Sequence, residues 1–443
     1  MADADDSREP FLPYLNPIAR PRSGSWVSMD EAIGAIEDRA RVFLAASAGT
    51  PVALSNALAD AHGRFTRIDV VSGYLMTRPR LFEHAGAPFH FITTQASLAF
   101  KHLWDTGSVR VLPARYSDYS GLLAADGPMA PDVALIQVSS PGPNGRVSLG
   151  LSVGANVDAA RSANLVIAQV NPRMPFTYGA GELEIGEIDL LVEHEEPVLE
   201  ARPADTSNDP DVATIARLAA AEVPNGATIQ FGVGAMPDAI LGALSGHTGL
   251  SVHSGMLSDV CVELLEAGAI SMTGKGFDDG VMIAAEVVST PSMMAWIDRN
   301  PTVRMAPPAY SHGAAVLGRI PHFVAINSAV EIALDGSANS ETASGRVMSG
   351  PGGAPDYAFG ASVSSGGRFI CALKSTASKG KISRIVPTIG PPDRVTLPAY
   401  LADRVVTEHG CASLRGLTQP ERAVALRSVA APHHREGLAH EIL

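Results

Sequence analysis

A glycine-containing turn joins an apolar segment to a helical segment in the second half of the sequence. Residues 230–238 read Gln-Phe-Gly-Val-Gly-Ala-Met-Pro-Asp, and Pro237 suits the first turn of a helix. Unpaired backbone N–H groups at such a helix start can face an anion or a developing oxyanion. Gly232 and Gly234 are therefore candidate catalytic residues. The alternative is that the two glycines serve only to turn the chain tightly.

A second loop is the part of the sequence richest in glycine and proline. Residues 349–357 read Ser-Gly-Pro-Gly-Gly-Ala-Pro-Asp-Tyr. Backbone that lacks side chains can lie against a flat or bulky ligand. This makes Gly350, Gly352 and Gly353 candidate ligand-binding residues, with an ordinary surface loop as the alternative.

Positive charge follows this loop in an otherwise acidic sequence. Local cations suit a phosphorylated ligand, so Lys374 and Lys379 join the candidate ligand-binding residues. A solvated basic face is the alternative. The cations concerned are Arg368, Lys374, Lys379, Lys381 and Arg384.

Several other chemistries are not expected. The sequence lacks HExxH and GxxxxGK[ST], and we do not expect a serine hydrolase of the GxSxG type. The adjacent His433 and His434 suit an exposed helix terminus better than a metal site. Cys261, Cys371 and Cys411 are widely separated, which favours buried thiols over disulfides or structural zinc.

Composition limits the class of protein. The chain has 443 residues, of which 46% are hydrophobic and only 18% charged, which predicts a globular fold with a substantial core. The net charge of −13 makes nucleic acid an unlikely partner. No apolar run is long enough for a membrane span and no basic leader precedes an apolar core, so a cytoplasmic protein is expected.

The elements that must position these residues alternate between short apolar strands and helices, a pattern typical of parallel βαβ units. We expect an N-terminal arm and helix over residues 1–48 and an α/β domain over 49–205. The polar, proline-containing stretch before residue 210 suggests a boundary near Thr206. A second α/β domain is expected over 206–443, giving two tandem related halves with mostly parallel sheets.

Eight ordered segments together resemble the acetyl-CoA hydrolase/transferase family, which includes 4-hydroxybutyrate CoA-transferase, a class I CoA-transferase. The resemblance covers about residues 50–436. The segments are 132–153, 165–175, 229–241, 252–259, 325–336, 349–357, 381–387 and 405–416.

The resemblance implies a CoA-transferase-like fold with CoA lying along the second half, and a homo-oligomer. Its partners would be an acyl-CoA and a carboxylic acid, with coenzyme A entering as substrate and no permanently bound cofactor or metal. In the family, a glutamate attacks the acyl-CoA, forms a mixed anhydride and then a glutamyl-CoA thioester, and passes CoA to a second carboxylic acid.

The sequence departs from the family at the nucleophile. The family carries this glutamate third in a His-Ser-Glu triplet, whereas this chain reads His253-Ser254-Gly255. Glu286 is the candidate replacement, because it lies in the apolar run 282–288, where the family usually has an aromatic residue. A charge in such a run is costly unless it is paired or functional. We expect the ends of the strands at 250–254 and 281–287 to lie near each other in a parallel sheet, so that Glu286 could reach the vacated space. The alternative is that Glu286 faces solvent or forms a structural ion pair.

Three functions remain open. The first is CoA transfer through a relocated Glu286; the second is hydrolysis of an acyl-CoA, or of a carbon–carbon bond in a CoA-linked substrate, with Glu286 as base. The third is a CoA-binding protein without catalysis. Glu408 is interpreted as structural or cleft-lining, and Glu331 and Glu341 are weaker candidates for the nucleophile.

Overall fold

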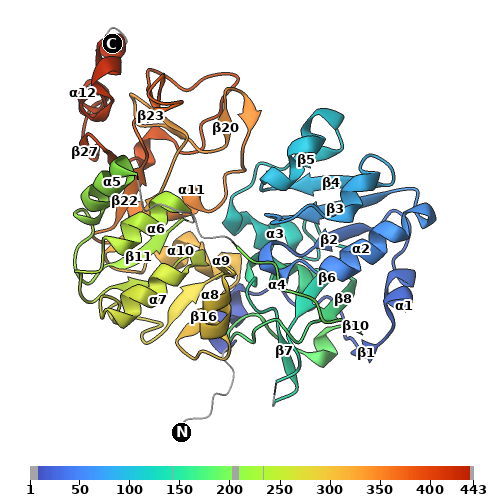
Figure 1. Cartoon of the computed structure of the whole chain (residues 1–443). Coiled ribbons are helices and arrows are strands. Elements are labelled where there is room, and N and C mark those ends of the chain that lie inside the picture. Colours follow the sequence, from blue (N-terminus) through green and yellow to red (C-terminus); the bar gives the residue numbers. More distant parts are fainter. Residues whose placement is uncertain (1–7, 143, 202–208, 233, 440–443) are drawn as a thin grey trace. The chain divides into compact units, whose positions relative to one another are not determined.

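The computed structural model describes residues 8–142, 144–201, 209–232 and 234–439, which fold into two compact α/β units (Figure 1). Unit 1 consists of Met1–Ala201 and Ile283–Ser311, and unit 2 consists of Arg202–Met282 and His312–Leu443. The expected boundary near Thr206 lies outside the described residues. Residues 283–311 belong to unit 1, although the expected second domain included them.

Unit 1 is built on an eight-stranded sheet in which every neighbouring pair is parallel. Its strands are buried on both faces, as all six residues of the central β6 show, and this explains their continuous apolar sequence. In spatial order the strands are β1 (Ser25–Trp26), β10 (Leu190–Glu193), β8 (Leu165–Val170), β6 (Val133–Val138), β2 (Arg41–Leu44), β3 (Ile68–Ser72), β4 (Phe89–Thr93) and β5 (Val109–Val111).

The expected N-terminal arm is part of this unit. β1 and β2 supply two strands of the sheet, because they pair with β10 and with β3 and β6. Phe11 is fully buried and packs edge-to-face on Tyr310 at 4.9 Å. Strands and side chains between residues 8 and 50 therefore contribute to the sheet and core of unit 1.

Helices cover the sheet of unit 1 between the strands. Helix α1 begins at a capping box in which Ser28 and Glu31 satisfy each other's backbone N–H groups. The helices are α1 (Met29–Gly34), α2 (Val52–Asp60), α3 (Tyr119–Leu123), α4 (Gly154–Ser162), α8 (Pro291–Ile297) and α9 (Pro308–Ser311). The 3₁₀ helices are η1 (Glu9–Tyr14), η2 (Ser47–Gly49), η3 (His62–Arg64), η4 (Arg80–His84), η5 (Leu98–Thr106), η6 (Tyr116–Asp118) and η7 (Ile185–Glu187).

Short strands outside the main sheet complete this part of the chain. Strands β7 (Arg146–Ser148) and β9 (Glu182–Glu184) form an antiparallel pair. In the sequence, β7 comes before α4 and β8, and β9 comes after them. The segment that carries Glu286 is split into β14 (Met282–Ala284) and β15 (Glu286–Val287), and β14 pairs with β16 (Val303–Met305).

Unit 2 contains a six-stranded sheet that is parallel except at one edge, where β27 runs antiparallel to β26. In spatial order its strands are β12 (Ser251–Val252), β11 (Thr228–Phe231), β17 (Phe323–Asn327), β22 (Arg368–Ala372), β26 (Arg404–Thr407) and β27 (Gly410–Ser413). Two parallel α/β units agree with the predicted fold class.

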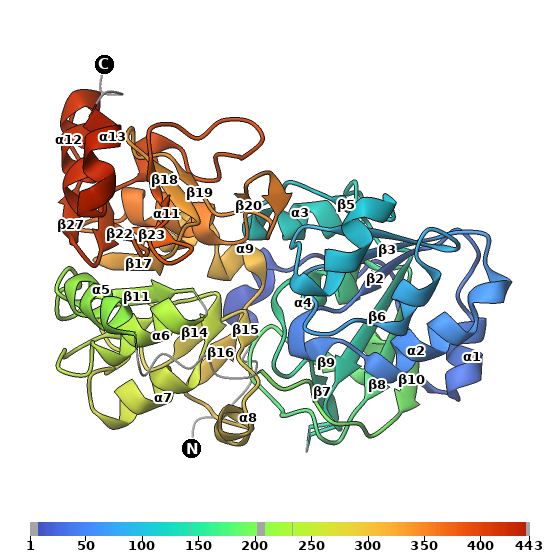
Figure 2. The same ribbon diagram turned by 45° about the horizontal axis from the view of Figure 1, so that its top comes forward.

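The helices of unit 2 have clear start signals. α5 begins where Asp209 caps the backbone N–H groups of Asp211 and Val212, with Pro210 in the first position. α11 packs on β17 and β22, and α12 lies beside α13 (Figure 2). The helices are α5 (Pro210–Ala220), α6 (Ala235–Gly242), α7 (Asp259–Glu266), α10 (Ala314–Leu317), α11 (Ala354–Val363), α12 (Gln419–Val429) and α13 (Arg435–Ala439), with η8 (Ala399–Leu401) and η9 (Pro432–His434).

Unit 2 also contains short strands that lie outside its six-stranded sheet. They are β13 (Met256–Leu257), β18 (Glu331–Ala333), β19 (Ala338–Asn339), β20 (Thr342–Ala343), β21 (Arg346–Val347), β23 (Thr376–Ala377), β24 (Ile382–Ser383) and β25 (Ile385–Val386). All three cysteines are free thiols; Cys261 and Cys371 are buried as predicted, and Cys411 is half-buried. Among the described residues, no helix has the length and apolarity needed to cross a bilayer.

Candidate active site

The backbone around Glu286 is fixed by the segment that leads into α4. The N–H group of Val287 donates to the carbonyl of Leu151 at 2.9 Å, and those of Val153 and Gly154 donate to the carbonyl of Ala285 at 3.0 and 3.1 Å. Glu286 also forms an antiparallel bridge with Ser152. These bonds place the Glu286 side chain at the start of α4, within unit 1.

The Glu286 carboxyl group is buried and hydrogen-bonded on one side. The hydroxyl of Tyr116 donates to Oε1 at 2.8 Å, whereas Oε2 makes no hydrogen bond within the described residues. Burial raises the pKa of Glu286 from its ordinary value of 4.5 to about 7, and the neighbouring Ser152 and Tyr116 hydroxyls limit the rise by favouring the carboxylate. With only 7% of Glu286 exposed, the solvent-facing alternative is wrong.

Gly154 makes room for this pair. A Cβ atom on Gly154 would lie 2.0 Å from the Tyr116 hydroxyl oxygen and 2.8 Å from Oε1 of Glu286. Real Cβ atoms do not approach polar atoms so closely, so position 154 requires glycine. The start of α4 also favours negative charge, because helix N-termini carry partial positive charge.

Ser152 lies in a pentapeptide that the sequence-based expectation overlooked. Residues 150–154 read Gly-Leu-Ser-Val-Gly, which has the spacing of a serine-hydrolase nucleophile elbow. However, Ser152 is fully buried, and its hydroxyl donates to the carbonyl of Ala46 at 3.1 Å and accepts from Nδ2 of Asn156 at 2.9 Å. Its proton is therefore held by a backbone carbonyl rather than by a base.

The segments that hold Gly255 and Glu286 are not neighbouring strands of one parallel sheet. The strand before Gly255, β12, is the edge strand of the six-stranded sheet of unit 2, next to β11. The Glu286 strand, β15, lies outside the six-stranded sheet; it belongs to unit 1 and is bridged to Ser152. Period and length of an apolar run cannot reveal which sheet a strand joins, and here the chain returns to unit 1 for residues 283–311.

In unit 2, an imidazole and a phenol occupy the space beside Gly255. A Cβ atom on Gly255 would lie 2.8 Å from Nε2 of His312 and 2.9 Å from the hydroxyl oxygen of Tyr357. The two rings pack with centroids 4.5 Å apart at 40°. Ser254 anchors the turn, because its hydroxyl donates to the carbonyl of Phe231 at 3.2 Å. A glutamate at 255 would collide with both rings.

One of the two predicted oxyanion donors is already used. The N–H group of Gly232 donates to the carbonyl of Ile326 at 3.1 Å, so the expectation that it faces a ligand is wrong. Gly234 has φ of 118°, a conformation that favours glycine, and it directly precedes α6, with Pro237 in the first turn of that helix as predicted.

The second glycine loop ends at the start of α11. Gly353 is the residue before this helix, and Gly352 has φ of 59°. Gly352 and Gly353 are half-buried, whereas Gly350 is buried. The loop therefore presents two side-chain-free residues at its accessible edge.

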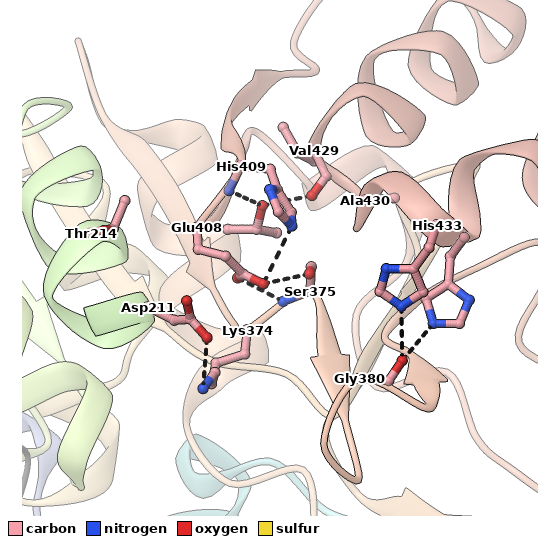
Figure 3. A network of polar contacts seen from close by, with 12 residues as sticks. Asp211, Thr214, Lys374, Ser375, Gly380, Glu408, His409, Val429, Ala430 and His433 are labelled. Atoms are coloured by element: carbon pink, nitrogen blue, oxygen red, sulfur yellow. Dashed lines mark hydrogen bonds and ion pairs between the residues drawn. The ribbon is translucent and has the colours of Figure 1, made fainter. Parts of the chain in front are cut away.

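The predicted cation cluster is largely paired. Figure 3 shows Lys374 beside Asp211, and its Nζ lies 3.0 Å from one carboxylate oxygen of Asp209 and 3.0 Å from one of Asp211. These carboxylates compete with any phosphate for Lys374, which weakens its prediction as a ligand-binding residue. Arg368 pairs with Glu222 at 3.6 Å.

Lys379 differs from Lys374 because it is exposed. It lies in the turn between β23 and β24 with φ of 58°. The next residue, Gly380, accepts hydrogen bonds at its carbonyl from Nε2 of His433 and of His434, at 2.9 and 3.0 Å (Figure 3). These histidines fasten the turn to the C-terminal segment, and the described residues contain no His/Cys/Asp/Glu group suited to a metal ion.

The other predicted carboxylates have structural partners. Glu408 accepts from the backbone N–H of Ser375 at 2.9 Å and from its hydroxyl, as Figure 3 shows, which agrees with a structural interpretation. Glu341 accepts from the hydroxyl of Thr396 and Glu331 from Nδ2 of Asn339, each at 2.9 Å.

The sequence of this chain is similar to family models and to known proteins. Residues 24–200 match the model of the acetyl-CoA hydrolase/transferase N-terminal domain, and residues 290–442 match that of the C-terminal domain. The chain is 35% identical to 4-hydroxybutyrate coenzyme A transferase of Clostridium kluyveri over 94% of this chain and 96% of that protein. It is 25% identical to an acetyl-CoA hydrolase of Eremothecium gossypii over 66% of this chain and 62% of that protein.

Solved structures give the same result. RipA from Yersinia pestis superposes with a TM-score of 0.88 at 29% identity, covering 94% of this chain and 96% of RipA. A 4-hydroxybutyrate CoA-transferase from Porphyromonas gingivalis superposes with a TM-score of 0.79 at 29% identity, covering 94% of this chain and 97% of that one. The chain therefore has the CoA-transferase fold and belongs to the acetyl-CoA hydrolase/transferase family of enzymes.

Proposed function

We propose that this protein acts on acyl-CoA thioesters and that Glu286 is its working carboxylate. The observation that carries the proposal is the state of this side chain: it is buried, held at Oε1 by Tyr116, and makes no hydrogen bond at Oε2 within the described residues. A carboxylate with one oxygen fixed and the other unused suits attack on a carbonyl or removal of a proton from water. Membership of a CoA-transferase family supports the thioester as substrate.

Transfer of CoA to a second carboxylic acid is the first form of this reaction. The Glu286 carboxylate would attack the acyl-CoA carbonyl and expel the CoA thiolate, giving a mixed anhydride. The thiolate would then attack the glutamyl carbonyl and release the acyl group as a carboxylate, leaving a glutamyl-CoA thioester for the acceptor acid. The CoA-transferases among the relatives support this form.

Hydrolysis is the second form, and the pKa of about 7 favours it. A general base works best when its pKa lies near the pH of the reaction. Glu286 would take a proton from water while the water oxygen attacks a carbonyl carbon. This carbon is either that of the thioester, whose C–S bond then breaks, or that of a carbonyl in a CoA-linked substrate, whose adjacent carbon–carbon bond then breaks. The thiolate or carbanion that leaves would recover the proton.

Coenzyme A would enter as a substrate and would not be a permanent cofactor. The loop residues Gly350, Gly352 and Gly353 and the exposed Lys379 remain the proposed contacts of coenzyme A. A cytoplasmic homo-oligomer remains the expected form of the protein, and light scattering on the purified chain measures its mass.

The test compares Glu286→Gln with the wild type on acetyl-, butyryl-, succinyl- and 4-hydroxybutyryl-CoA, with and without acetate or succinate as acceptor. Glu193→Gln is the matched control, because Glu193 is an exposed glutamate of the same unit. We expect Glu286→Gln to bind CoA normally without turnover. Dependence on an acceptor identifies transfer, whereas ¹⁸O from labelled water in the product acid without an acceptor identifies hydrolysis.

Near-normal turnover by Glu286→Gln would reject Glu286 as the working carboxylate. CoA binding without turnover by the wild type over the whole panel would instead support a CoA-binding protein that has lost catalysis.

A further inference from the structure

The residues that face Gly255 form a polar cluster in unit 2, and the proposed function gives no role to its two rings, those of His312 and Tyr357. We call it the 255 cluster; its members are Gly255, His312, Gly353 and Tyr357. Gly353 contacts His312 even more closely than Gly255 does, since a Cβ atom there would lie 2.5 Å from Cδ2 and 2.6 Å from Nε2 of the imidazole. His312 is thus packed against two glycine backbones, and neither position can carry a side chain without moving it.

The Tyr357 hydroxyl is the unusual group of the 255 cluster. Tyr357 is 2% exposed, and its hydroxyl makes no hydrogen bond within the described residues. Buried hydroxyls nearly always have a hydrogen-bond partner, and the exceptions call for an explanation such as a catalytic role or a bound water. Its ring packs against His312 and Phe323, with centroids at 4.5 and 6.2 Å, so the phenol is held in place on its sides.

Both rings of the cluster are neutral at neutral pH. Burial lowers the pKa of His312 well below its usual range, and the neighbouring His253 lowers it further. Burial raises the pKa of Tyr357 well above its usual range, and the charge of Asp356 adds to the rise. The phenol therefore keeps its proton and is available as a donor.

We propose that the 255 cluster is a carbonyl-binding site, in which the Tyr357 hydroxyl donates a hydrogen bond to the carbonyl oxygen of an acyl-CoA ligand and His312 positions the phenol. The inference rests on the proposed function for the identity of that ligand. Preorganised neutral donors of this kind stabilise a carbonyl oxygen, and more strongly the oxyanion that forms from it. The half-buried Gly352, which precedes Gly353 in the loop, has no side chain and lets a ligand approach the backbone closely.

A carbonyl suits the 255 cluster better than a phosphate or a carboxylate. Neither ring carries charge at neutral pH, and an anion held away from water needs a charged partner to offset its desolvation. A carbonyl group needs only a donor. A glycine at position 255 in place of the family's glutamate would therefore remove a charged side chain and leave space for the neutral side chains of His312 and Tyr357.

The test measures binding of two probes by isothermal titration calorimetry. The first is acetyl-dethia-CoA, in which a CH₂ group replaces the thioester sulfur and the carbonyl cannot be cleaved as a thioester. The second is CoA, which lacks the acyl carbonyl. Tyr357→Phe removes only the hydroxyl oxygen, and Tyr400→Phe is the matched control because Tyr400 is 77% exposed in the same unit.

We expect Tyr357→Phe to weaken binding of acetyl-dethia-CoA roughly three- to tenfold, the range for one neutral hydrogen bond, and to change CoA binding less than twofold. Without ligand, Tyr357→Phe should be at least as stable as the wild type, because it removes an unsatisfied buried hydroxyl. Equal affinity of the wild type and Tyr357→Phe for acetyl-dethia-CoA would overturn the inference while leaving the proposed function intact. A wild-type chain that binds neither probe would overturn both.

A double-mutant cycle tests the positioning role of His312. If the imidazole holds the phenol in place, adding Tyr357→Phe to His312→Ala should weaken acetyl-dethia-CoA binding no further. Fully additive losses would show that His312 does not act through Tyr357. Circular dichroism and thermal unfolding of each variant confirm that the binding data refer to folded protein.

Discussion

The hydroxyl of Tyr116 donates a 2.8 Å hydrogen bond to Oε1 of Glu286, and within unit 1 Glu286 is buried and Tyr116 half-buried. Burial keeps the phenol protonated, since it raises the pKa of Tyr116 well above its usual range. Tyr116 is therefore a fixed donor that stabilises the charged form of Glu286. The hydrogen bond between Tyr116 and Glu286 therefore influences which fraction of Glu286 is ionised at neutral pH.

Tyr116→Phe should raise the pKa of Glu286 further, because it removes a hydrogen bond that favours the carboxylate. A charge-assisted hydrogen bond contributes about 1.5–3 kcal/mol, or roughly one to two pKa units. The ascending limb of the kcat/KM profile against pH should move to higher pH by about that amount, while the maximum rate at high pH is largely retained. An unchanged profile would show that Tyr116 does not control the ionisation of Glu286.

The stability of the protein should carry the signature of a buried carboxyl group. Glu286 binds a proton more tightly in the folded state, with a pKa of about 7, than in the unfolded state, with a pKa near 4.5. Its protonation therefore stabilises the fold below about pH 4.5, and this stabilisation is lost as the pH rises to 7. The free energy of unfolding of the wild type minus that of Glu286→Gln should fall by about 3 kcal/mol over this interval. Denaturant titrations at several pH values measure it, and a difference that does not vary with pH would contradict the burial of the charge.

Gly154→Ala should disturb the same site through space alone. Its Cβ atom would lie 2.0 Å from the Tyr116 hydroxyl oxygen, so the phenol or the helix start must shift. We expect a loss of stability of about 1–3 kcal/mol and a loss of turnover. Gly34→Ala is the control, because Gly34 lies in helix α1 with no atom within 4 Å of the added methyl group. Equal effects of the two substitutions would refute the steric argument.

A glutamate placed at position 255, where the resemblance to the family predicts the nucleophile, should not create a working site. In Gly255→Glu the new side chain meets His312 and Tyr357 within 2.9 Å of its first carbon atom. We expect the variant to be less stable than the wild type by at least about 1–3 kcal/mol and to have no gain in CoA transfer. Adding His312→Ala should recover part of the lost stability, which thermal unfolding would reveal. A stable, transfer-active Gly255→Glu would show that the two rings do not close this space.

Two lysines that look alike in sequence should differ in their effect on coenzyme A. Lys374 is held by Asp209 and Asp211, whereas Lys379 is exposed. Lys379→Ala should weaken CoA binding and reduce its dependence on salt, because it removes an exposed cation. Lys374→Ala should change CoA affinity less than twofold. The opposite order of the two effects would reject the assignment of Lys379.

The sequence was sufficient for the fold class and the family, whereas the roles of Gly255 and Glu286 as departures from the family pattern stay predictions. Alternating apolar runs predict parallel strands because both faces of such strands are buried, as in β6. The sequence was not sufficient for the surroundings of these residues. Tyr116 is 170 residues before Glu286, and only the chain's return to unit 1 at residue 283 brings the two together.

The same limit explains why His312 and Tyr357 received no predicted role. His312 stands in a segment without a motif, and Tyr357 ends a loop in which only the glycines attracted attention. Two signals could have pointed to them: a histidine in an otherwise apolar, glycine-containing segment, and a phenol at the start of an apolar helix. The hydrogen bond that uses the Gly232 N–H group was likewise invisible, because a turn sequence does not show which carbonyl lies opposite.

The most direct test of the central claim is the rate at which Glu286→Gln consumes the best acyl-CoA substrate in the presence of an acceptor acid, compared with the wild type and Glu193→Gln at pH 8. The substitution keeps the size and hydrogen-bonding capacity of the side chain and removes only its ability to ionise. If Glu286 is the working carboxylate, the rate should fall by about 10²- to 10⁴-fold, whereas Glu193→Gln keeps wild-type activity. A Glu286→Gln rate within a few-fold of the wild type would contradict the account.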